Sequence, residues 1–276
     1  MRSKEEWTER LIMPLYQNQF IQTLWNAAKE KNRNEGWILV SGAWAPWYFN
    51  IRPVGDAPEL FHDICQAMAE MIMGYDDVDL LIGVEMAGVP LVGAVATTLF
   101  NMGRLQRFGY TRPTPAKGLT QDGVAKLLKS IDAGVSSYGE KDFVEARMKD
   151  GDRIGIIDDM ATNLGSKIVA RALILWQAKQ FGLTVNCGRV FYFLNRGQDN
   201  REKGLNFAVE SELALYPAKL FVDYVIEFND AMPFLKKAMK SGEYDLITSY
   251  QANPGQFQGY ENSLRDKAIA MAAKGL

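Results

Sequence analysis

The pattern of apolar and polar positions along the chain predicts an alternation of strands and helices. Apolar residues at helical spacing predict helices, which we place at 57–74, 88–100 and 165–180. Short continuous apolar runs predict buried strands, which we place at 78–84, 104–110, 153–157, 189–194 and 222–226. Strands that alternate with helices in this way are typical of a parallel sheet flanked by helices, so the predicted fold class is α/β.

The two ends of the chain carry additions to this core. Near the N-terminus, helical spacing between residues 5 and 32 predicts one or two helices with a break near Pro14. Near the C-terminus, the pattern predicts helices at 233–241 and 256–274. We expect three parts: N-terminal helices and a small hood at 1–56, a core at 57–228 and a C-terminal helical extension at 229–276.

The segment from residue 111 to residue 150 differs from the rest of the core. It is polar, rich in glycine and lysine, and without clear periodicity apart from one short helix predicted near 122–131. A connection of this length is unusual inside a compact domain and favours a functional or mobile loop.

Composition narrows the class of protein. The chain has 276 residues, of which 47% are hydrophobic and 23% charged, as in an ordinary globular enzyme. Its formal net charge of −2 argues against a general nucleic-acid binder. No apolar stretch reaches the length of a membrane span and the N-terminus lacks the apolar segment of a signal peptide, so we expect a cytoplasmic protein.

Cysteine and histidine offer little chemistry. Cys65 and Cys187 lie far apart and do not form a disulfide framework, and no Cys/His cluster predicts a metal site. His62, the single histidine, falls on a predicted helix, where a surface or packing role is the favoured interpretation.

The most informative segment runs from Ile154 to Ser166. An apolar run ends in Asp158 and Asp159, and a small polar loop then opens a helix. Ligands of parallel sheets bind at the carboxyl ends of strands, where two acids can hold sugar hydroxyls or a hydrated cation. Backbone N–H groups at a helix N-terminus suit a phosphate. The same pattern also fits a strand end with two surface acids and a serine-containing helix start, and both interpretations remain open at this point.

This segment resembles the diphosphate-sugar loop of the type I phosphoribosyltransferases, and it matches that loop at Asp158, Asp159, Thr162, Gly165 and Ser166. Three other segments resemble the orotate branch of that family. They are Ser41 to Arg52, with Ser41-Gly42, Ala45-Pro46, Tyr48 and Asn50; Gly83 to Leu91; and Asn195 to Gln198. The resemblance covers about residues 36–226.

The resemblance implies transfer of a phosphoribosyl group from phosphoribosyl diphosphate to orotate, giving orotidine 5′-monophosphate and pyrophosphate in pyrimidine biosynthesis. It implies that Asp158 and Asp159 hold the ribose and, through water, Mg²⁺, and that Arg112 and Lys117 close over the pyrophosphate. Thr162 and Arg196 would contact orotate. The other predicted donor-binding residues are Thr162, Asn163, Gly165, Ser166, Ala87 and Gly88. The family is usually dimeric, which implies a homodimer here.

Two positions depart from the family pattern. Leu164 stands where a glycine is usual, and Val40 stands where the branch usually has a lysine. The mobile loop of the family contains a lysine, and its motif can be placed here in two ways. In one placement Lys117 supplies this lysine. In the other, after an insertion, the motif matches residues 136–139, which contain no lysine. Two alternatives therefore stay open: a phosphoribosyltransferase for another base, and a non-catalytic nucleotide-binding paralogue or regulator.

Overall fold

The computed structural model describes residues 1–27, 35–39, 42–112, 143–162, 164–196, 220–259 and 262–275. The chain forms two compact units. The first consists of residues 1–2 and 62–225, and the second of residues 3–61 and 226–276, so that the N-terminal and C-terminal segments share one unit.

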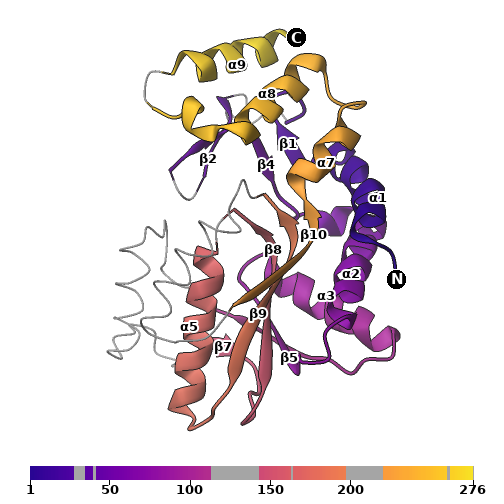
Figure 1. Cartoon of the computed structure of the whole chain (residues 1–276), viewed down its shortest axis with the longest axis vertical. Coiled ribbons are helices and arrows are strands. Elements are labelled where there is room, and N and C mark those ends of the chain that lie inside the picture. The colour runs from indigo at the N-terminus through magenta and orange to yellow at the C-terminus, as the bar shows by residue number, and fades with distance from the viewer. Residues whose placement is uncertain are drawn as a thin grey trace. The chain divides into compact units, whose positions relative to one another are not determined.

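The first unit is built on a six-stranded sheet with the strand order β10-β9-β8-β5-β6-β7 (Figure 1). Its strands are β5 (Leu80–Gly83), β6 (Arg107–Thr111), β7 (Val144–Glu145), β8 (Arg153–Ala161), β9 (Asn186–Asn195) and β10 (Phe221–Glu227). β5 pairs in parallel with β6 and with β8, and β8 pairs in parallel with β9. β7 runs antiparallel to β6.

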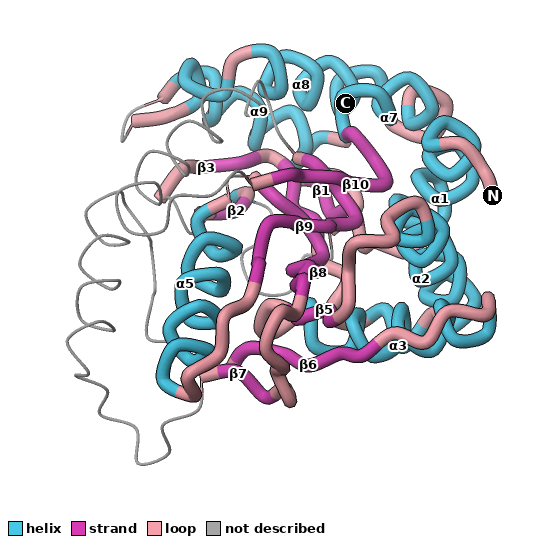
Figure 2. Tube along the Cα trace, turned by 60° about the horizontal axis from the view of Figure 1, so that its bottom comes forward, coloured by secondary structure: helices cyan, strands magenta, loops and turns pink. Residues whose placement is uncertain are grey.

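Helices cover both faces of this sheet. They are α2 (Pro58–Met73), α3 (Gly88–Asn101) and α5 (Gly165–Gln180). Figure 2 shows α3 and α5 on opposite sides of the sheet. A buried apolar cluster joins α5 to β8 and β9, and it includes Ile156, Leu164, Ile168, Leu173 and Val190.

The second unit combines short strands with helices from both ends of the chain. Its helices are α1 (Lys4–Gln17), η2 (Val54–Asp56), α7 (Phe228–Leu235), α8 (Ser241–Ala252), η3 (Pro254–Phe257) and α9 (Ser263–Lys274). Its strands are β1 (Ile21–Thr23), β2 (Trp37–Ile38), β3 (Trp44–Ala45) and β4 (Trp47–Phe49), which pair antiparallel as β1 with β4 and β2 with β3.

Buried contacts join the two ends of the chain within this unit. The carboxylate of Glu243, only 1% exposed, accepts hydrogen bonds from the hydroxyls of Tyr16 and Thr23. The ring of Trp47 stacks on Phe228 with 3.8 Å between centroids. Residues 181 to 227 positions apart therefore form one core.

The predicted parallel-sheet core flanked by helices is confirmed. The predicted helix break near Pro14 is wrong, because α1 runs through Pro14 to Gln17. The missing N–H of Pro14 falls in the last turn of α1, where it removes one hydrogen bond, and the buried residues continue across it to Leu15. The helical region predicted between residues 5 and 32 also contains a strand, because β1 spans Ile21–Thr23.

The helix predicted at 233–241 is also wrong. α7 begins at Phe228 and ends at Leu235, and α8, which the pattern did not predict, begins at Ser241. The buried residues Phe228, Met232 and Leu235 are spaced as on one helical face, so packing sets the start of α7 before Pro233.

Other expectations can be compared with the described residues. Cys65 and Cys187 are buried, and the side chain of His62 is 71% exposed. No helix in the described part of the chain combines the length and apolar character that a bilayer crossing requires.

Candidate functional site

The candidate site lies where the connections of the sheet change direction. From β5 the chain crosses through α3 to β6 on one side, and from β8 it crosses through α5 to β9 on the other. β5 and β8 are neighbours, with Gly83 beside Ile157. In open parallel sheets, ligands bind outside the carboxyl ends of strands at such a switch point.

β8 continues past the predicted end at residue 157 to Ala161, so the two acids lie within the last part of the strand, and they have different surroundings. Asp158 is 6% exposed, and its carboxylate accepts a hydrogen bond from the backbone N–H of Asp159 at 2.9 Å. Asp159 is half-buried, and its carboxylate accepts from the N–H of Met160 at 2.8 Å. The pKa of Asp159 is raised to about 7, because burial and the Asp158 carboxylate disfavour its charged form more than the Lys167 ammonium favours it.

The loop that leads into α5 presents polar groups to solvent and its apolar residue to the core. Thr162 and Ser166 are exposed, and Gly165 begins the helix. Leu164 is 6% exposed and belongs to the apolar cluster under α5. Its side chain therefore packs against the core at the position where the family usually has a glycine.

A second turn, after β5, lies close to β8 beside the acid pair. The N–H of Val84 donates to the carbonyl of Ile157 at 2.9 Å. A Cβ on Gly88 would lie 2.7 Å from the same carbonyl oxygen, so only glycine fits there without a shift. Ala87 is 7% exposed beside it. The structure thus brings the predicted residues Ala87 and Gly88 to the end of β8.

Arg196 follows β9 at the same edge of the sheet. Asn195 pairs with Ala161, and the N–H of Arg196 donates to the carbonyl of Ala161 at 2.9 Å. The Arg196 side chain is 3% exposed, which excludes a solvated residue at a strand end. Arg196 is therefore held next to Thr162, the residue with which it was predicted to act.

Arg112 follows β6 and is held by a neighbouring strand. Its Nε donates to the Glu145 carboxylate of β7 at 2.6 Å, and both side chains are about one-third exposed. Contact with a pyrophosphate would therefore compete with this ion pair. The other predicted loop residues lie outside the described residues, and these are Lys117, Asn163, Val40 and the stretch 136–139.

Lys167 is a charged residue of this site that the sequence interpretation missed. It is 4% exposed, and its Nζ lies 2.6 Å from the Asp158 carboxylate. Arg171, one helical turn further along α5, is 2% exposed. The sequence does contain a signal for this pair. Lys167 and Arg171 are four residues apart in the first turns of a helix, where the positive end of the helix dipole disfavours cations.

The acid pair can be tested for its fit to a magnesium ion. Among the described residues, no group of three or more His, Cys, Asp or Glu side chains could hold a metal ion directly. Asp159 is the less buried of the two acids, whereas Asp158 is paired with Lys167. The residues therefore suit hydrogen bonds to the waters of a hydrated cation rather than direct coordination.

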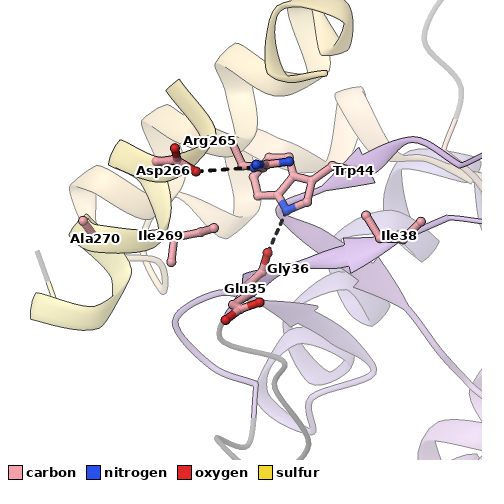
Figure 3. A pocket seen from close by; sticks show the side chains of 8 residues that line it. All are labelled: Glu35, Gly36, Ile38, Trp44, Arg265, Asp266, Ile269 and Ala270. Carbon is pink, nitrogen blue, oxygen red and sulfur yellow. Dashed lines mark hydrogen bonds and ion pairs between the residues drawn. The ribbon is translucent and has the colours of Figure 1, made fainter. Parts of the chain in front are cut away.

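A separate pocket lies within the second unit, between α9 and the β2–β3 hairpin (Figure 3). Its volume is about 630 Å³. Figure 3 shows the indole of Trp44 donating to the Glu35 carbonyl and the guanidinium of Arg265 beside Asp266. Its other lining residues are Gly36, Ile38, Ile269 and Ala270. None of the predicted site residues lines it.

Comparison with solved structures identifies the fold. The chain superposes on the orotate phosphoribosyltransferase of Francisella tularensis with a TM-score of 0.55 at 16% identity, covering 87% of this chain and 93% of that chain. It superposes on the UMP synthase of Leishmania donovani with a TM-score of 0.58 at 15% identity, covering 89% of this chain and 42% of that one. The fold is that of the type I phosphoribosyltransferases.

Within this class, the sequence is similar to the orotate branch. It is 27% identical over 140 residues to the orotate phosphoribosyltransferase of Ruegeria sp. (strain TM1040), covering 50% of this chain and 51% of that protein. It is 26% identical over 133 residues to the one from Methanocaldococcus jannaschii, covering 48% and 60%. The chain spans about half the length of the curated relatives it matches. No family model matches the chain. The resemblance to the orotate branch predicted from the motifs is confirmed.

Proposed function

We propose that the protein transfers a phosphoribosyl group from phosphoribosyl diphosphate to orotate, forming orotidine 5′-monophosphate and pyrophosphate. Such an enzyme would serve pyrimidine biosynthesis, and the resemblance implies a cytoplasmic homodimer that uses Mg²⁺. The observation that carries this proposal is the acid pair and helix-opening loop at the switch point between β5 and β8, in a chain whose curated relatives are orotate phosphoribosyltransferases.

The chemistry assigns a part to each side of the site. Breaking the bond between the anomeric carbon and the pyrophosphate builds positive charge on the sugar and negative charge on the leaving group, so positioning and charge stabilisation are the main requirements. Asp159 would accept hydrogen bonds from the ribose hydroxyls. The backbone at Gly165 and the hydroxyls of Thr162 and Ser166 would hold the phosphate of the sugar.

The acceptor and the leaving group would lie on either side of that sugar. The guanidinium of Arg196 suits the carboxylate of orotate, with Thr162 beside it. The turn at Ala87 and Gly88 would approach the pyrophosphate, and Arg112 and Lys117 would close over it and exclude water. When bound, Mg²⁺ would neutralise charge on the pyrophosphate.

The position of Leu164 bears on the choice between an enzyme and a non-catalytic paralogue. A side chain at this position could obstruct the phosphate if it pointed into the loop. Because Leu164 is buried with Ile168 in the cluster under α5, it leaves the solvent side of the loop to backbone and hydroxyl groups. Leu164 therefore does not favour the non-catalytic alternative.

The test is an assay of the purified protein with phosphoribosyl diphosphate, Mg²⁺ and a panel of bases. We expect loss of orotate absorbance, with Asp159→Asn strongly impaired. The matched control is Asp245→Asn, on the exposed side of α8, which should keep full activity. Arg196→Ala should raise the KM for orotate and leave the KM for the donor nearly unchanged, with exposed Arg147→Ala as its control.

The remaining outcomes decide between the alternatives. Turnover of a purine but not of orotate would assign the protein to another base. Tight binding of phosphoribosyl diphosphate without turnover of any base would assign it to the non-catalytic class. Absence of binding to the donor would overturn the proposal.

A further inference from the structure

Lys167 occupies a position that is electrostatically unfavourable. It lies in the first turn of α5, where the helix dipole disfavours a cation, and its side chain is only 4% exposed. Its helix neighbour Ile168 and nearby Leu164 are apolar core residues. An apolar side chain would fill this space at a lower cost of desolvation, so packing alone does not explain a lysine here.

The contacts of Lys167 join two elements of the site. Its Nζ lies 2.6 Å from Oδ2 of Asp158 and also donates to the carbonyl of Met160. Both partners belong to the end of β8, whereas Lys167 belongs to the first turn of α5. The loop that leads from β8 into α5 lies between these elements. The buried ion pair of Lys167 therefore links the strand before the loop to the helix after it.

Both carboxylate oxygens of Asp158 have a partner within the protein. One of its carboxylate oxygens accepts from the backbone N–H of Asp159 and the other meets Lys167. Asp158 is 6% exposed, whereas Asp159 is half-buried. The two acids that appear equivalent in the sequence are therefore not equivalent in the structure.

We infer that Lys167 is a positioning residue for the phosphoribosyl donor. It fixes the loop between β8 and α5 in the geometry that receives the phosphate, and it holds Asp158 in an internal contact. Asp159 is then the one acid of the pair that contacts the ribose hydroxyls. This inference rests on the proposed function for the identity of the ligand. The link that Lys167 makes between β8 and α5, which we call the tie, is independent of that function.

The tie is tested on the ligand-free protein by amide hydrogen exchange. In Lys167→Met we expect exchange in peptides covering residues 160–167 to be about tenfold faster than in the wild type. Asp158→Asn should accelerate the same peptides, and Asp159→Asn should not. The matched control is Lys179→Met, an exposed lysine in the last turn of α5, which should leave the exchange unchanged. Unchanged exchange in a folded Lys167→Met variant would overturn the inference.

Lys167→Met leaves a buried carboxylate without its cation and can fail to fold for that reason. The double variant Lys167→Met/Asp158→Asn removes both charges and is measured alongside it. Its circular dichroism and thermal melting show whether it folds, and its exchange at residues 160–167 should still exceed that of the wild type.

The role in donor binding is tested with ribose 5-phosphate in the absence of metal, by isothermal titration calorimetry. We expect Lys167→Met and Asp158→Asn each to weaken binding about tenfold, and the double variant to be no weaker than either single variant. Asp159→Asn should add its own loss to that of Lys167→Met. If Asp158→Asn weakens binding as Asp159→Asn does while the loop exchange stays slow, Asp158 contacts the sugar itself and the inference fails. If the wild type binds neither ribose 5-phosphate nor phosphoribosyl diphosphate, the proposed function fails, and the exchange data still decide the tie.

Discussion

The parallel strands of the first unit begin at one edge of the sheet, the amino edge, and end at the opposite one, the carboxyl edge. Charged residues occur at both edges, but their pairing and burial differ. Towards the amino edge, Asp77 pairs with Arg189 and Asp79 pairs with Arg153, with all four side chains at least 23% exposed. At the carboxyl edge, Lys167 and Asp158 form a pair whose side chains are 4% and 8% exposed, with Asp159 next to them.

This difference separates charges that hold the fold from charges that prepare a site. Hydrogen bonds from Arg189 and Arg153 hold the pKa of Asp77 and Asp79 below its usual value, to about 2 for Asp79. The pKa of Asp159 is raised to about 7 instead. Each exposed acid has its own arginine, whereas two acids share one buried lysine. An acid whose pKa is strongly perturbed by burial and a neighbouring charge is typical of functional sites.

Substitution of one acid at each edge should give the largest difference in activity between the two edges. Asp159→Asn removes the charge that would meet the ribose, so kcat/KM for phosphoribosyl transfer should fall by about 100-fold or more. Asp77→Asn removes a comparable carboxylate from the other edge and should leave kcat/KM within about twofold. Steady-state kinetics with orotate measure both. Equal losses in the two variants would mean that the edges do not differ in function.

The glycines of α3 provide the next largest effect. A Cβ at Gly88 would meet the Ile157 carbonyl at 2.7 Å, so Gly88→Ala should shift the turn, lower stability by about 1–3 kcal/mol and impair donor binding. Gly93→Ala, in the same helix, would place its Cβ 3.6 Å from Phe108, an ordinary contact. It should be neutral or stabilising by about 0.5–1 kcal/mol. Urea unfolding and donor titration measure both variants, and an equally tolerated Gly88→Ala would contradict the close approach.

The sequence predicted the elements of this edge better than their electrostatics. Period and run length located β5, β8 and α5 because each buries a continuous apolar set. Motif resemblance located Asp158 near the carboxyl end of β8, Gly88 at the start of α3 and Arg196 directly after β9. The sequence could not show that Lys167 turns inwards to Asp158, because this depends on which face of α5 meets the sheet. The second unit was predicted less well, since its core joins Trp47 to Phe228 across 181 positions and short strands carry little periodicity.

The raised pKa of Asp159 predicts how stability depends on pH. An acid whose pKa is higher in the folded state than in the unfolded state lowers stability as pH rises from its ordinary value of 3.8 to about 7. Asp159→Asn removes this penalty. Its Tm should therefore match that of the wild type near pH 4 and exceed it by about 2–4 °C near pH 8. Thermal melts by circular dichroism at both pH values measure the gap, and a gap that narrows with rising pH would contradict the raised pKa.

The exposed pairs of the amino edge should give the smallest effect and the opposite dependence on pH. The pKa of Asp79 is lowered to about 2, so its pairing stabilises the fold above its ordinary pKa of 3.8, and this contribution is lost as pH falls towards 2. Because both partners are more than one-third exposed, water and salt screen the pair. Asp79→Asn should therefore lower Tm by no more than about 2 °C near pH 7, and by less in about 1 M NaCl. Thermal melts at low and high salt measure this, and a larger loss that persists in high salt would place Asp79 with the buried charges of the carboxyl edge.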